Sequence, residues 1–126
     1  MKTRIAQFVA ITLALYACPT CADSTSRTPV EDARSLMIAA IDSATGEAHG
    51  MLTGPMAEAI SMRFQSQAPI TIDVSTQKRF AQAGCSRLKV LFAQDGVLLP
   101  GKKSPERRTI EFGINYCRDG MPPRPM

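Results

Sequence analysis

The spacing of apolar residues changes along the chain, from helical in the N-terminal half to alternating in the C-terminal half. Residues 29–45 carry apolar side chains every three to four positions, which predicts an amphipathic helix. Thr28 and Pro29 are typical of a helix start. Three glycines in the stretch 46–54 predict a loop, and Pro55 opens a second segment with helical spacing. The N-terminal half is therefore expected to form one helix or two.

From residue 70 onward, apolar and polar residues alternate, which is typical of strands with one buried face. The alternating segments lie at residues 70–75, 88–92 and 110–116, and a further short strand is plausible at 97–99. Glycine-containing turn signals separate the last two long segments. The pattern predicts an α+β fold, in which one or two N-terminal helices pack on a small antiparallel sheet of about three strands.

The last two predicted strands also predict a disulfide. In an antiparallel pair, directly opposed residues have numbers with a constant sum. A sum of 202 aligns three apolar couples: Leu88 with Ile114, Val90 with Phe112, and Phe92 with Ile110. The same sum places Cys85 opposite Cys117. Cross-strand neighbours lie close enough for a disulfide, so we expect a Cys85–Cys117 bridge that clamps the open end of the hairpin, outside the apolar core.

The beginning of the chain is typical of an export signal. Two basic residues precede the uncharged, mostly apolar run 5–17, which is too short to span a bilayer. Cleavage after Ala22 predicts a soluble periplasmic protein. Alternatively, the stretch ending at Cys18 resembles a bacterial lipobox, and lipidation of Cys18 would make the chain an outer-membrane lipoprotein. In neither case do Cys18 and Cys21 remain as a free dithiol pair.

Length and charge then define the mature protein. We expect a signal peptide at 1–22, a single domain at 23–117 and a Pro-rich tail at 118–126, because a chain of 126 residues suffices for one domain. Residues 23–77 hold seven acids and three bases, whereas residues 78–126 hold ten bases and four acids. This asymmetry suggests an acidic protein partner, an anionic surface of the envelope, or nucleic acid. The alternative, which we favour, is that the basic residues lie on solvated edges and loops of the sheet.

Motifs for catalysis or for a cofactor are few. His49 is the single histidine, the carboxylates are spread singly, and both mature cysteines are assigned to a disulfide. We therefore expect no enzyme and no cofactor. The alternative is a periplasmic module that binds a small ligand or copper, because thioether and imidazole groups suit Cu(I). Its ligands would be His49 with Met37, Met51, Met56 and Met62, although methionines more often fill cores.

Basic and proline residues of the predicted hairpin loop and tail indicate contact with a protein partner in the cell envelope. They are Lys102, Lys103, Arg107, Arg108, Arg118, Pro122, Pro123 and Arg124. An edge of the sheet offers a second mode, in which a partner adds a strand. Nucleic acid is not expected, because aromatic residues that would stack on bases are scarce. Membrane contact is expected only if Cys18 is lipidated.

Four segments of the chain resemble one group of proteins: LTGPMAEAI, APITIDVST, GCSRLKVLFAQDGVLLPG and FGINYCRDGMPPRP. They are similar to small exported proteins encoded among bacterial conjugative-transfer and type IV secretion genes, over roughly residues 50–125. That group has no established activity or ligand, so the resemblance implies a setting and no site residue. The sequence therefore predicts a non-enzymatic, exported accessory or protein-interaction component of the bacterial envelope.

Overall fold

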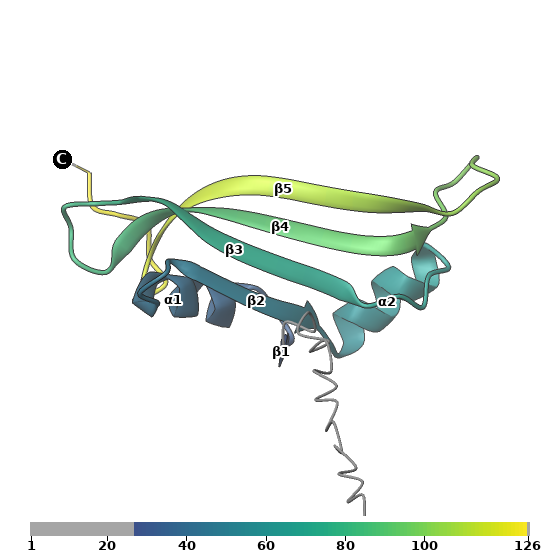
Figure 1. Cartoon of the computed structure of the whole chain (residues 1–126), viewed down its shortest axis with the longest axis horizontal. Coiled ribbons are helices and arrows are strands. Elements are labelled where there is room, and N and C mark those ends of the chain that lie inside the picture. Colours follow the sequence, from purple (N-terminus) through teal and green to yellow (C-terminus); the bar gives the residue numbers. More distant parts are fainter. Residues whose placement is uncertain (1–26, 126) are drawn as a thin grey trace, which may run out of the picture.

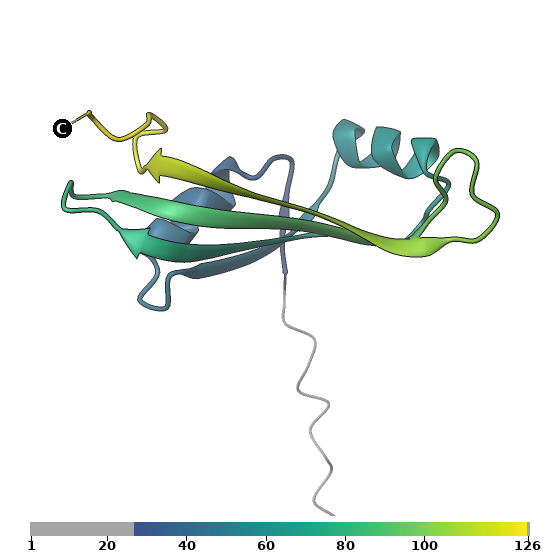
Figure 2. The same cartoon turned by 90° about the horizontal axis from the view of Figure 1, so that it is seen from above.

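The computed structural model describes residues 27–125, which form a five-stranded mixed sheet with two short helices on one face (Figures 1 and 2). The elements are β1 (Thr28–Val30), α1 (Arg34–Asp42), β2 (Glu47–Leu52), α2 (Pro55–Arg63), β3 (Ile70–Arg79), β4 (Cys85–Val97) and β5 (Glu106–Cys117). The strands lie in chain order across the sheet. β1 pairs in parallel with β2, and all other neighbours are antiparallel. Within residues 27–125, no helix is long and apolar enough to cross a membrane.

The prediction of about three antiparallel strands is wrong, and the first reason lies in residues 28–30. This segment was expected to start a helix, but it forms β1, whose proline is compatible with an edge strand. The helix begins only at Arg34, where the Asp32 carboxylate accepts a hydrogen bond of 2.9 Å from the backbone N–H of Arg34. Thr28 and Pro29 therefore belong to the sheet and not to a helix cap.

The second reason lies in the glycine-rich stretch 46–54, which was expected to be a loop but contains β2. Gly46 does form a turn, with φ at +74°. Gly50, in contrast, lies inside the strand beneath α1, where an added Cβ would be only 2.5 Å from Leu36 Cδ1. Glycine at position 50 thus allows close approach of the helix to the sheet, a role that local sequence does not distinguish from a turn.

Other expectations are confirmed. Helix α2 begins at Pro55, and the three alternating segments are strands β3, β4 and β5, each longer than expected. The β4–β5 register is the one deduced from the apolar pairs, and Cys85 forms a disulfide with Cys117. The short additional strand at 97–99 is absent from the described residues, because Val97 is the last residue of β4.

The hydrophobic core lies between α1 and the even-numbered side chains of β2, β3 and β4. Ile72, Val74, Leu88 and Val90 are almost fully buried there, under Ala40 of α1. Helix α2 has no fully buried residue and contributes only partly buried side chains to the core. Both helices lie on this face (Figure 2), which leaves the odd-numbered side chains on an open face.

Candidate protein-interaction surface

Strand β5 is a long, unpaired edge of the sheet. It has 12 residues, and no other strand pairs along its outer side (Figure 1); the tail reaches this side only at the end of β5, where the Cys117 N–H donates to the Met121 carbonyl at 3.0 Å. β1, at the other edge, has only 3 residues. Proteins commonly protect exposed edges with charged residues, proline or a bulge; between Thr109 and Asn115, β5 has no proline and no bulge, and Glu111 is its one charged residue. β5 is therefore an edge that can accept another strand.

Hydrogen bonding shows which backbone groups of β5 face outward. The Arg118 N–H donates to the Gly84 carbonyl at 2.8 Å, so this even-numbered position faces β4. In an antiparallel ladder, residues alternate between facing the partner strand and facing away. Because the register is constant from Cys117 to Arg108, the odd-numbered residues face the free edge. They are Thr109, Glu111, Gly113 and Asn115.

Apolar side chains accompany this edge on the helix-covered face. Ile110 is 67% exposed and Phe112 is 41% exposed, although both lie on the same face as the core. Phe112 stacks on Phe92 of β4, with ring centroids 6.2 Å apart. Near Ile110, Phe64 of α2 borders a shallow apolar groove. We call Phe92, Ile110, Phe112 and Ile114 the apolar strip. Phe92 and Ile114 are partly buried against the core, whereas Ile110 and Phe112 remain exposed.

The predicted partner-binding residues lie at the two ends of β5 and are not brought together (Figure 1). At the hairpin end, Lys102 and Lys103 are exposed, and Arg107 pairs with Asp95 at 2.9 Å. Arg108 also forms an ion pair, with Glu106 at 2.8 Å. The hairpin end is therefore basic, with two of its four cations already paired within the chain.

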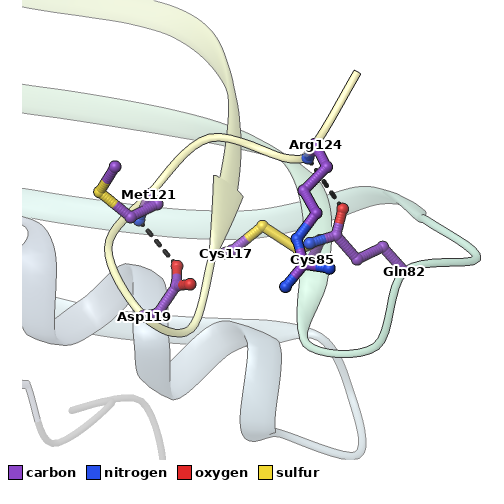
Figure 3. The surroundings of a disulfide bond; sticks show 6 residues. All are labelled: Gln82, Cys85, Cys117, Asp119, Met121 and Arg124. Carbon is purple, nitrogen blue, oxygen red and sulfur yellow. Dashed lines mark hydrogen bonds between the residues drawn. A yellow bond between two sulfur atoms is a disulfide. The ribbon is translucent and has the colours of Figure 1, made fainter. Parts of the chain in front are cut away.

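The tail end is folded against the sheet. Arg118 pairs with Asp42 at 2.8 Å, and the Arg124 backbone N–H donates to Gln82 Oε1 at 2.9 Å (Figure 3). Pro122 and Pro123 line a cleft whose other wall includes Lys78, Arg79, Phe80 and Gln82. The tail up to residue 125 thus returns along the β3–β4 hairpin.

The disulfide closes the β4–β5 hairpin at this same end (Figure 3). The Cα atoms of Cys85 and Cys117 are 4.0 Å apart. Both residues are 3% exposed, but neither belongs to the main core cluster. The bridge therefore acts as a clamp at the base of the hairpin. Cys18, the alternative lipidation site, lies outside the described residues, as do the expected signal peptide at 1–22 and both expected cleavage positions.

The single histidine belongs to an ionic cluster on the open face. His49 Nδ1 lies 2.6 Å from Asp73 Oδ1, and the Arg27 guanidinium donates to the same oxygen at 2.7 Å. Partial burial raises the pKa of Asp73, but the hydrogen bonds from Arg27 and His49 outweigh it, so the pKa is lowered overall. Because Arg27 also donates to the Gly50 carbonyl, the cluster ties the start of β1 to β2 and β3.

The methionines of the copper alternative do not gather around His49. Met51 shares the open face with it, but Met37 belongs to α1 and is buried in the core. Met56 and Met62 are exposed on α2. Among residues 27–125, no group of three or more His, Cys, Asp or Glu side chains is arranged to hold a metal ion.

Comparison of the chain with protein-family models, with curated proteins and with solved structures finds no match. The candidate site is therefore defined from the structure of the chain alone. Sequence reasoning assigned Ile110 and Phe112 to a buried face and did not single out the β5 edge. One signal was present in the sequence: the residues that directly follow β5 are rich in proline, which does not donate to a strand ladder.

Proposed function

We propose that this protein is a non-enzymatic, exported accessory component of the bacterial envelope that binds a protein partner along β5. The observation that supports it best is the long β5 edge, which pairs with no other strand and has Ile110 and Phe112 exposed beside it. The export signal expected at residues 1–22 supports a periplasmic location, with the lipoprotein anchored at Cys18 as the alternative. The resemblance of its segments supports a setting in conjugation or type IV secretion.

Strand addition accounts for both parts of the surface. Backbone groups of an incoming strand would bond with the outward-facing groups between Thr109 and Asn115 and supply affinity. Side chains of that strand would pack on the apolar strip and supply specificity. The basic hairpin with Lys102 and Lys103 would raise the rate of association with an acidic partner.

Photocrosslinking in living cells tests this proposal. A photoreactive phenylalanine analogue is placed at Thr109 or Phe112, and at Gln77 as a matched exposed control on β3. Adducts are expected from the two β5 positions and not from Gln77. Equal adducts from all three positions, or none from β5, would contradict the proposal.

A backbone variant separates strand addition from other contacts. Thr109→Pro removes an outward N–H without removing a bond to β4, whereas Thr109→Val keeps that N–H. The expected result is loss of the Phe112 adduct with proline and its retention with valine. Retention with both variants would exclude backbone pairing at this edge.

A further inference from the structure

Strand β5 is complementary to itself. We infer that the partner of the β5 edge is a second copy of this chain, paired antiparallel about a two-fold axis at Phe112. This inference rests on the proposed function of β5 as an interaction edge. Under a two-fold axis both copies use the same surface for the contact. The residue at the axis therefore determines which residue of the second copy lies opposite each residue of β5.

The helix-covered face favours Phe112 as the centre. With that centre, the opposed pairs are Phe112 with Phe112, Ile110 with Ile114, and Arg108 with Tyr116 of the second copy. The central pairs, Phe112 with Phe112 and Ile110 with Ile114, thus bring apolar side chains together, and the exposed Ile110 and Phe112 would be covered.

Neighbouring centres are worse matched. A centre at Glu111 opposes two Glu111 carboxylates, and like charges directly opposed are destabilising. A centre at Gly113 opposes Arg108 to Arg118, and a centre at Ile110 opposes Phe112 to Arg108. The centre at Phe112 opposes no like charges, and it places Arg108 opposite Tyr116 at the end of β5, so that the central Phe112 faces an apolar partner.

Residues on the open face also favour the two-fold axis at Phe112. The guanidinium of Arg87 lies over Gly113, where an added Cβ would be 2.6 Å from its Nη2. With the axis at Phe112, Glu111 of the second copy lies directly opposite Gly113, on the face that carries Arg87. Within the described residues Arg87 forms no ion pair, and its guanidinium donates one hydrogen bond, to the Asn115 amide oxygen at 3.1 Å. Glu111 has only a loose contact with Lys89 in its own chain, at 3.9 Å. Each copy thus offers an unpaired cation where the other brings a carboxylate.

Backbone pairing is compatible with this register. The outward-facing residues pair with one another, Thr109 with Asn115 and Glu111 with Gly113 of the second copy, which gives about eight backbone hydrogen bonds. The two sheets then join into one continuous sheet. The basic hairpin of one copy comes to lie near the basic tail of the other, a like-charge contact that the central apolar pairs and the Arg87–Glu111 contacts have to outweigh.

A cysteine scan of purified, disulfide-intact protein tests the register. Three variants are compared: Phe112→Cys, Glu111→Cys and Gly113→Cys. In each, the new thiol lies opposite the same thiol of the second copy only if the two-fold axis passes through that residue. Under mild oxidation, Phe112→Cys is expected to form a covalent dimer fastest, with the Cys85–Cys117 bridge confirmed intact by mass spectrometry. Faster dimerisation of Glu111→Cys or Gly113→Cys, or none by any variant, would overturn the inference.

A charge exchange tests the contact on the open face. In sedimentation equilibrium, Arg87→Glu and Glu111→Arg are each expected to weaken the dimer about tenfold or more, and the double variant to restore it. Failure of the double variant to recover would overturn the Arg87–Glu111 pairing. A monomeric wild-type protein whose Thr109 photocrosslinks reach a different protein would refute self-pairing and leave the proposed function standing.

Discussion

Removing the disulfide should destabilise the protein by an amount that its loop length sets. Cys85 and Cys117 are 32 residues apart in sequence. The loop-entropy model gives about 3–4 kcal/mol at 25 °C for closing a loop of that length. A domain of this size has a total unfolding free energy of roughly 5–15 kcal/mol. The variant Cys85→Ala/Cys117→Ala should therefore lose a large share of its stability, and more than the loop term alone, because both residues are buried.

Urea unfolding followed by far-ultraviolet circular dichroism measures this loss. Three samples are compared: the oxidised protein, the reduced protein and the double alanine variant. The reduced protein keeps both sulfur atoms, so its difference from the oxidised protein reports the cross-link, and its difference from the variant reports packing. A loss below about 1 kcal/mol on reduction would refute the loop-entropy argument for this hairpin.

Two further substitutions test the sheet. Asp73→Asn should destabilise the protein by about 1 kcal/mol at pH 7, because it removes charge-assisted hydrogen bonds at a half-buried site. The pKa of Asp73 is lowered in the folded state, so its contribution to the free energy of unfolding is present above the ordinary pKa of a carboxyl group and is lost as the pH falls through the lowered pKa. The melting temperatures of the two proteins should therefore converge in acid. A constant difference between them at every pH would contradict this. Gly50→Ala should cost about 1–3 kcal/mol in urea unfolding through the clash with Leu36, and Leu36→Ala should reduce that cost in the double variant, whereas additive effects would exclude the clash.

The sequence predicted the parts of the fold that depend on local alternation. Strands β3, β4 and β5 and their register followed from period-two apolar residues and from the positions of Cys85 and Cys117. β1 and β2 were missed because pairing across the fold determines them. The proline of β1 is equally typical of a helix start, and the glycines of β2 are equally typical of a loop.

The candidate site was predictable only in part, for a related reason. Alternation at Ile110 and Phe112 shows that one face of β5 is apolar, but it does not show whether a helix covers that face. The length and position of α1 and α2 decide the exposure of both residues. The charged residues of the hairpin and tail were easier to list, yet their separation along β5 required the sheet topology.

The Cys85–Cys117 bridge also has a consequence for recognition. A slip of two residues between β4 and β5 would keep every side chain on its own face, so apolar alternation alone does not prevent it. The bridge prevents this slip and so fixes the position of Arg87 on β4 relative to Glu111 on β5. Reduction would therefore do more than destabilise the fold. It would allow β5 to pair with β4 in several registers, each of which presents a different arrangement of side chains along the β5 edge. Selectivity at the proposed β5 edge should then be lost when the bridge is reduced.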